Sequence, residues 1–203
     1  MQPLEDSDTP RPRSPEAHRR RAVAAMAEAV AEQGYAATTV EDILMRARMS
    51  RRTFYQLFSN REECFLATYD AALEEAMERL ALAHGGNGQQ WQGQVETALT
   101  ALFEYLASEP GLARVWLVEA PSVGAAGIER HEHTMKQLAE RLAWLQQDGG
   151  GGSADARGTV RFEATVGAVH RVVQARLLDG RAEELPELAP HMARVVRGLV
   201  SPG

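Results

Sequence analysis

Three arginines lie where helices are predicted to begin, and this placement points to anion binding rather than to catalysis. Arg51 and Arg52 follow Ser50, a preferred N-cap residue, and Arg61 opens the next predicted helix. A helix N-terminus carries partial positive charge, so each cation there costs roughly 0.3–1 kcal/mol unless an anion is present. The phosphates of DNA would supply that anion. Arg also matches guanine and Gln matches adenine in the major groove, which brings in Gln56.

Two short helices joined by a tight turn must position these side chains. The first is predicted over 39–47, with Thr38 or Thr39 as its N-cap and Glu41 three residues after Thr38, the spacing of a capping box. The turn is 48–49, and the arginine-bearing helix follows it. A helix-turn-helix presents its second helix to the major groove of DNA.

The same stretch resembles the N-terminal domain of the TetR (tetracycline repressor) family of bacterial regulators over about residues 17 to 70. The resemblance is carried by Gly34-Tyr35, Thr38-Thr39-Val40-Glu41-Asp42-Ile43, Ala47-Arg48-Met49-Ser50, Thr53-Phe54-Tyr55, Phe58 and Arg61-Glu62. The chain departs from the family at Arg48, where the family usually has glycine. If that turn requires positive φ, arginine is strained there.

Together, the pattern and the resemblance predict an all-α fold of about nine helices in two domains. A disordered tail, 1–14, should precede a three-helix helix-turn-helix domain, 15–61, and a helical effector-binding and dimerisation domain, 62–203. The helices are expected over 15–33, 39–47, 50–57, 60–84, 89–108, 112–120, 125–147, 160–178 and 188–200. Asn60 and Glu63 should form a second capping box. Pro186 and Pro190 should confine the last helix to their C-terminal side.

The charge distribution agrees with a DNA-binding domain attached to an acidic body. The 203-residue chain has a net charge of −6. Between Ala17 and Arg61, however, eight arginines face four acidic residues, giving +4 there and −10 elsewhere. A single cysteine, no long apolar run and no apolar signal core predict a cytoplasmic protein, associated with the nucleoid when bound to DNA.

We expect the DNA-binding side chains to come from the helix-turn-helix and its borders. Arg51, Arg52 and Gln56 are predicted to contact bases, and Ser50 to begin their helix. The predicted phosphate contacts are Thr39, Arg48, Thr53, Tyr55 and Arg61. Double-stranded operator DNA is therefore the expected partner, with pseudo-palindromic half-sites if the protein is a dimer.

The resemblance implies a small-molecule pocket in the body, and the bulky apolar residues there favour a hydrophobic or aromatic effector. The predicted ligand-binding residues are Phe103, Trp116, Glu119, Met135, His170 and Gln174. The helix over 160–178 is apolar on two sides, one of them lined by small residues, which indicates burial on both sides. The predicted homodimer interface is Ala164, Gly167, Ala168, Arg171, Ala175 and Val195.

Catalytic and metal-binding patterns are missing from the sequence. There is no Gly-x-Ser-x-Gly elbow, and the glycine run at 149–152 follows a helix rather than a strand. His131 and His133 are two residues apart, do not share a helix face, and are interpreted as solvated. We therefore expect no enzyme, metal or cofactor. The predicted function is a repressor released by its effector; the alternative is an activator or architectural DNA-binding protein without a small ligand.

Overall fold

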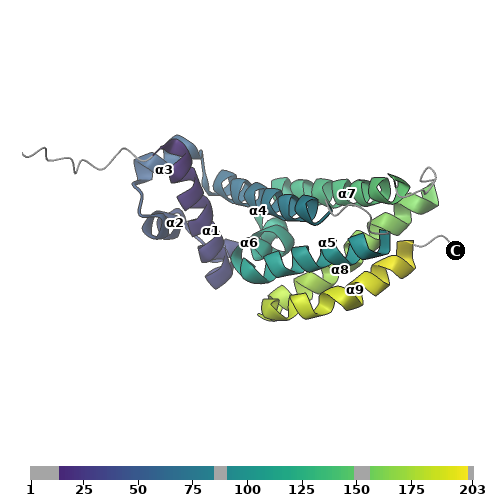
Figure 1. Cartoon of the computed structure of the whole chain (residues 1–203). Coiled ribbons are helices and arrows are strands. Elements are labelled where there is room, and N and C mark those ends of the chain that lie inside the picture. The colour runs from purple at the N-terminus through teal and green to yellow at the C-terminus, as the bar shows by residue number, and fades with distance from the viewer. Residues whose placement is uncertain (1–13, 85–90, 149–155, 201–203) are drawn as a thin grey trace, which may run out of the picture.

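The computed structural model describes residues 14–84, 91–148 and 156–200, and these form helices without a strand. Figure 1 shows α1 to α3 at one end of an elongated molecule and the longer helices of the body at the other. The bounds are α1 (Pro15–Ala37), α2 (Val40–Ala47), α3 (Arg51–Leu57), α4 (Arg61–His84), α5 (Trp91–Ser108), α6 (Pro110–Arg114), α7 (Ala125–Asp148), α8 (Ala156–Leu178) and α9 (Leu185–Val200). The all-α prediction is confirmed. The predicted tail lies almost wholly outside the described residues.

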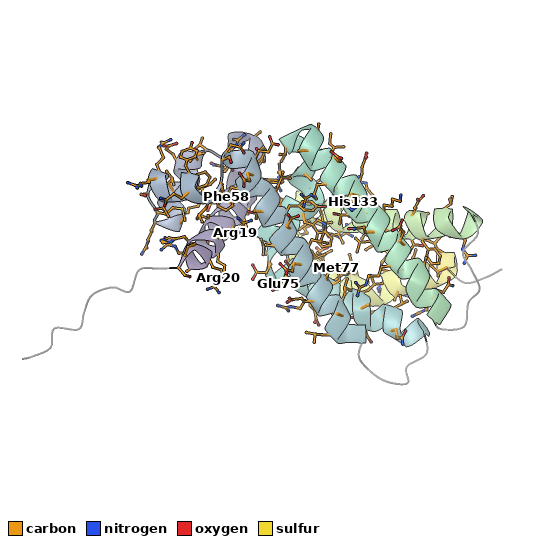
Figure 2. All side chains as sticks on the ribbon, turned by 90° about the horizontal axis from the view of Figure 1, so that it is seen from above. Arg19, Arg20, Phe58, Glu75, Met77 and His133 are labelled. Atoms are coloured by element: carbon orange, nitrogen blue, oxygen red, sulfur yellow. The ribbon has the colours of Figure 1, made fainter. Side chains whose placement is uncertain are left out.

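Helices α1 to α3 form a three-helix unit, here called the head, which packs around a small apolar core. Met26 of α1, Ile43 of α2 and Phe54 of α3 are fully buried against one another's helices. Phe58, after α3, is also buried, and the Arg19 guanidinium lies 5.0 Å from its ring centroid (Figure 2). This core fixes the orientation of α3 relative to α1 and α2.

The junction between α1 and α2 is irregular. Regular helix ends at Gln33 as predicted, because Gly34 takes φ 75° and ψ 163°, and a short helical turn then continues to Ala37. Of the two threonines, Thr39 is the N-cap of α2, and it forms a reciprocal capping box with Asp42. Thr38 is instead buried, and its hydroxyl donates to the Gly34 carbonyl at 2.8 Å.

Three local predictions were wrong. Glu63 accepts from the Ser59 N–H rather than the Asn60 N–H, although Asn60 does accept from the Glu63 N–H. The helix expected over 112–120 divides into α6, a π turn η1 (Val115–Glu119) and a 3₁₀ turn η2 (Ala120–Val123). Pro190 lies inside α9, where it is exposed, so water can reach the carbonyl that it leaves unpaired.

The body packs α5 against α4 and α9, and α7 against α8. Fully buried Phe103, Tyr105 and Leu106 give α5 its core side. The Tyr105 hydroxyl donates to the Ala72 carbonyl of α4 at 3.1 Å, which fixes the register of these two helices. None of the described helices is both long and apolar enough to cross a membrane.

Candidate DNA-binding surface and ligand pocket

Helix α3 is short, well capped and arginine-rich on its outer side. The Ser50 hydroxyl accepts from the Thr53 N–H at 3.0 Å, which satisfies one of the amides exposed at the helix start. Phe54 is completely buried, whereas Arg51, Arg52, Tyr55 and Gln56 are exposed. The solvent-exposed face of α3 is therefore cationic and polar, as a surface that enters a DNA groove requires.

Arg48 forms the turn with a left-handed backbone, φ 47° and ψ 52°. The turn does place this residue at positive φ, and a non-glycine residue there costs of the order of 1 kcal/mol. The Arg48 carbonyl accepts from the Arg21 side chain at 3.3 Å, which ties the turn to α1. Its own guanidinium has no partner among the described residues and is exposed.

The arginines at the helix starts differ in how they are paired. Arg51 forms an ion pair with Glu41, and these side chains are 57% and 63% exposed. Such an exposed pair contributes only about 0.2–1 kcal/mol, so a phosphate can replace Glu41 at little cost. Arg52 has no hydrogen bond or ion pair within the described part of the chain. Arg52 is therefore the helix-start cation most available to an external anion.

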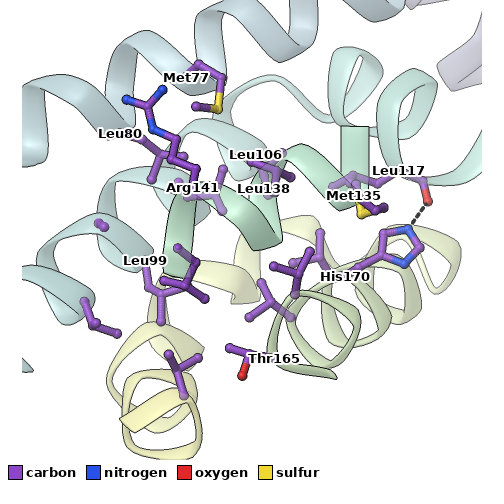
Figure 3. A pocket seen from close by; sticks show the side chains of 18 of the residues that line it. Met77, Leu80, Leu99, Leu106, Leu117, Met135, Leu138, Arg141, Thr165 and His170 are labelled. Atoms are coloured by element: carbon purple, nitrogen blue, oxygen red, sulfur yellow. Dashed lines mark hydrogen bonds between the residues drawn. The ribbon is translucent and has the colours of Figure 1, made fainter. Parts of the chain in front are cut away.

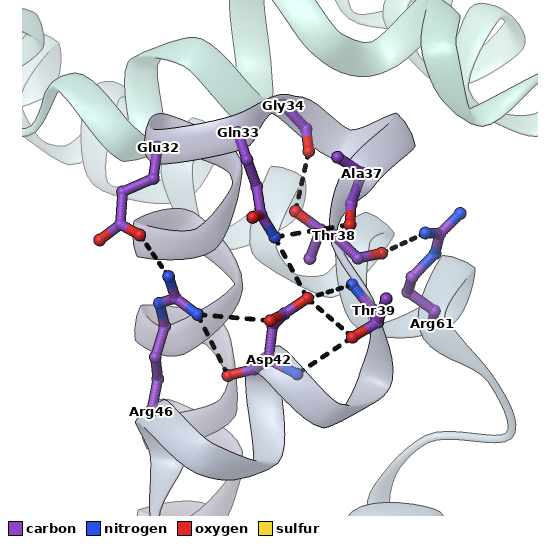
Figure 4. A network of polar contacts seen from close by, with 9 residues as sticks. All are labelled: Glu32, Gln33, Gly34, Ala37, Thr38, Thr39, Asp42, Arg46 and Arg61. Atoms are coloured by element: carbon purple, nitrogen blue, oxygen red, sulfur yellow. Dashed lines mark hydrogen bonds and ion pairs between the residues drawn. The ribbon is translucent and has the colours of Figure 1, made fainter.

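The Arg61 side chain makes intramolecular contacts instead of facing solvent freely. Its guanidinium lies 4.2 Å from the Tyr35 ring centroid and donates to the Thr38 carbonyl. Figure 4 shows this bond beside a network in which Asp42 accepts from Gln33 and Thr39. These bonds, led by those from Thr39, lower the pKa of Asp42. The network fixes the α1–α2 junction and hence the position of α3.

A carboxylate from the body completes this junction. Glu119, at the end of η1, is buried, and its Oε2 accepts from the Tyr35 N–H at 3.2 Å. Its Oε1 lies 3.1 Å from both Arg114 Nε and Nη2. Because Gly34 interrupts α1, the Tyr35 N–H has lost its helical partner, and a buried amide without an acceptor costs about 1–3 kcal/mol. Glu119 supplies that acceptor from 84 positions away.

The body contains a partly open apolar cavity of about 300 Å³ between α4, α5, α7, α8, α9 and η1. Figure 3 shows Arg141 beside Met77 and Leu80 on one side, and His170 near Met135 and Leu117 on another. Leucine, valine and methionine side chains make up most of the wall; the lining residues are Met77, Leu80, Ala81, Gln94, Val95, Ala98, Leu99, Leu102, Leu106, Trp116, Leu117, Met135, Leu138, Arg141, Leu142, Thr165, Val166, Val169, His170, Val173 and Val196. Such a wall suits an apolar ligand.

Two histidines lie together next to this cavity. The rings of His131 and His170 are 4.9 Å apart, and the His170 Nε2 lies 3.0 Å from the Leu117 carbonyl. Burial, and then the neighbouring His170, lower the pKa of His131 to about 4. The expectation that His131 is solvated was wrong, because α4 and α8 cover its side of α7. The described residues contain no group of three or more His, Cys, Asp or Glu arranged to hold a metal.

Comparison with known proteins assigns the head. Residues 23–68 match the family described as bacterial regulatory proteins, tetR family. The head is therefore similar to the N-terminal domain of that family. The match supports a DNA-binding transcriptional regulator, and the regulators of that family are not enzymes.

Solved structures share the fold of this chain over most of its length. The fatty acid degradation regulator FadR from Bacillus halodurans is 18% identical, with 89% of this chain and 95% of that chain covered and a TM-score of 0.78. FadR from Bacillus subtilis, solved in complex with stearoyl-CoA, is 19% identical (90% and 97% covered, TM-score 0.72). A TetR-family regulator from Streptomyces coelicolor is 22% identical (90% and 97%, TM-score 0.63). No curated protein shows significant sequence similarity to the chain.

The structure brings only some of the predicted site residues together. Of the predicted ligand residues, Trp116, Met135 and His170 line the cavity. Phe103 is buried outside the lining, Glu119 faces the head, and Gln174 lies next to the wall, 3.4 Å from the Leu117 carbonyl.

The predicted DNA-binding residues also separate. Arg48, Ser50, Arg51, Arg52, Tyr55 and Gln56 are exposed at or on α3, and so is Thr39 at the α2 cap, but Thr53 and Arg61 are half-buried. Thr39, Ser50, Thr53 and Arg61 all make intramolecular bonds. The predicted interface residues are exposed or half-buried on α8 and α9.

Sequence reasoning missed the α4 side of the cavity and, on α7, found Met135 but not Arg141. Met77 and Leu80 line it three residues apart on α4, and Arg141 does so from α7. The spacing of Met77 and Leu80 indicated a shared helix face. Nothing in the sequence distinguished a cavity wall from ordinary core.

Proposed function

We propose that the protein is a homodimeric repressor that binds a roughly palindromic operator through α3 and is released by an apolar effector. One observation carries the proposal: a single chain combines an exposed cationic helix with an apolar cavity in its body. The first feature serves DNA, and the second serves a small molecule. An architectural DNA-binding protein has no use for the second.

On the DNA side, the proposal assigns base contacts to Arg51, Arg52 and Gln56. Arg48 and Tyr55 would contact phosphates beside the bases that those residues read. Ser50 and Thr53 would contact the DNA at the start of the helix. Thr39 and Arg61 would act mainly by holding the α1–α2 junction, since both are engaged there. Exchange of the Arg51–Glu41 pair for a phosphate would accompany binding.

For dimerisation, the proposal uses the outward faces of α8 and α9. Apolar side chains are exposed there: Val160 (62%), Leu178 (53%), Val195 (48%) and Leu199 (39%). Added Cβ atoms at Gly167 and Gly198 would meet no heavy atom within 4 Å, so a second pair of helices can approach closely. The predicted interface residues Ala164, Gly167, Ala168, Arg171, Ala175 and Val195 lie on these helices. Two copies would bury this surface around a two-fold axis.

For the effector, we propose an apolar chain with an anionic end. The lining is almost wholly hydrocarbon, and Arg141 lies at its edge, exposed and without a partner among the described residues. A guanidinium there can pair with a carboxylate or phosphate while the apolar part enters the cavity. The structurally similar FadR from Bacillus subtilis was solved with stearoyl-CoA, and palmitate and stearoyl-CoA are suitable first probes.

The test begins with sequencing of the genomic fragments that the purified protein retains. An inverted repeat is expected, with half-sites one or more helical turns apart, and palmitate or stearoyl-CoA should release it. Gly167→Trp should weaken both the dimer, measured by sedimentation, and operator binding. Retained fragments without a shared motif would contradict the DNA assignment. The alternative without a ligand would be favoured if neither probe releases the DNA and no apolar compound in a library raises the protein's thermal stability.

A further inference from the structure

We infer that Glu119 is a positioning residue that couples the cavity to the DNA-binding head. The inference rests on the proposed function, because it concerns how an occupied cavity alters DNA binding. Its starting point is that one short segment, η1, belongs to both sites. Trp116 and Leu117 of η1 line the cavity, and Glu119 of η1 bonds to α1.

On the head side, the Glu119 carboxylate reaches the point where α1 changes direction. It accepts from Tyr35, the first residue after the Gly34 kink. Glycine is needed at position 34 because its φ is positive, and an added Cβ there would be in ordinary contact with Glu119 Oε1, at 3.4 Å. The carboxylate thus fixes the direction in which the chain leaves α1.

From Tyr35 the connection continues to the helix-turn-helix. The Tyr35 ring packs edge-on against Phe65 at 4.8 Å and lies under the Arg61 guanidinium. Arg61 holds the Thr38 carbonyl, and the next residue, Thr39, caps α2. A shift of Tyr35 therefore moves the start of α2 and, through the head core, α3.

On the cavity side, η1 is a segment that can change. A π turn is a rare departure from the α-helix that occurs mostly as a single turn, frequently at functional sites. Its Leu117 carbonyl accepts from the His170 and Gln174 side chains of α8, His170 being part of the cavity wall. A ligand that displaces His170 or Trp116 will shift η1, and Glu119 shifts with it. The head then loses the orientation that matches the operator.

The experiment compares Glu119→Ala, Glu119→Gln and the control Glu184→Ala in the full-length protein. Glu184 also pairs with arginines, Arg176 and Arg181, but has no contact with the head. Operator affinity without ligand should fall at least tenfold in Glu119→Ala, because the Tyr35 amide loses its acceptor. Glu119→Gln should recover most of it, since its amide oxygen still accepts, and Glu184→Ala should match the wild type. Hydrogen exchange at the Tyr35 amide should accelerate only in Glu119→Ala.

The second measurement is the ratio of operator affinities with and without saturating palmitate. Glu119→Ala should bind palmitate within threefold of the wild type, yet its ratio should fall to below three. Wild-type operator affinity and unchanged Tyr35 exchange in a folded Glu119→Ala variant would overturn the positioning role. A wild-type palmitate response in that variant would overturn the link to the cavity. Failure of the wild type to bind DNA, or to respond to palmitate, instead identifies a fault in the proposed function.

Discussion

The head and the body of this protein are held together in different ways. The α1–α2 junction uses nearly every polar side chain in a dense network, in which Thr38, Thr39, Asp42 and Arg61 bond to the backbone or to one another (Figure 4). The body is held chiefly by apolar packing and leaves a cavity open within it (Figure 3). Directional bonds fix one geometry, whereas apolar contacts tolerate rearrangement. Under the proposed function, the surface that binds DNA and the pocket that responds to a ligand require these opposite properties.

The largest expected effect is on stability, and it distinguishes a core residue of α5 from a cavity-lining residue of the same helix. Phe103→Ala removes a fully buried ring outside the cavity lining and should cost about 3–5 kcal/mol of unfolding free energy. Leu102→Ala, its neighbour on the cavity wall, should cost about 2 kcal/mol and should also weaken binding of palmitate. Urea unfolding and ligand titration measure the two. Equal costs would show that the cavity wall is packed as tightly as the core.

In the head, Arg52→Ala should weaken operator binding by about 1–3 kcal/mol while leaving thermal stability unchanged. The guanidinium makes no hydrogen bond, ion pair or ring contact within the described part of the chain, so we expect the fold not to depend on it. Lys136→Ala is the control, an exposed cation of the body. The salt dependence should also become shallower for Arg52→Ala alone. Unchanged affinity and salt slope would remove Arg52 from the DNA-binding surface.

A pH measurement tests the buried polar part of the body. Because burial lowers the pKa of His131 to about 4, the unfolded chain binds the proton more tightly than the folded one. The stability that the neutral His131 ring contributes is therefore fully present above about pH 6.5, and it is lost as the pH falls toward 4. The loss from this ring between pH 7 and pH 5 should be about 1 kcal/mol, reduced by its partial exposure. His131→Gln should remove this part of the pH dependence; identical pH profiles would place the proton elsewhere.

The smallest expected effect concerns a single cap. Thr39→Ala removes the hydroxyl that accepts from the Asp42 N–H and should destabilise the protein by about 1 kcal/mol. Operator affinity should fall with it, because the cap fixes the start of α2. Thr100→Ala, whose hydroxyl bonds within α5, is a control that should lose less stability and no affinity. A loss of stability without any loss of affinity would mean that the head tolerates movement of α2.

Much of the head could be predicted because its signals are local. Ser50 caps α3 and regular α1 stops at Gly34, each as residue type and spacing indicate. Capping depends on a few neighbouring residues. The internal role of Arg61 was misjudged because it depends on the Tyr35 ring, which lies beneath its guanidinium from another helix.

The sequence by itself determined the helical class, the helix-turn-helix and the separation of positive head from negative body. Those properties follow from periodicity, caps and charge, which are written along the chain. The tertiary structure alone decided which apolar residues surround a cavity, that His131 is shielded from water, and that Glu119 faces α1 instead of the ligand pocket. Each of these depends on how helices far apart in sequence pack, and on a π turn whose irregular rotation no spacing rule anticipates.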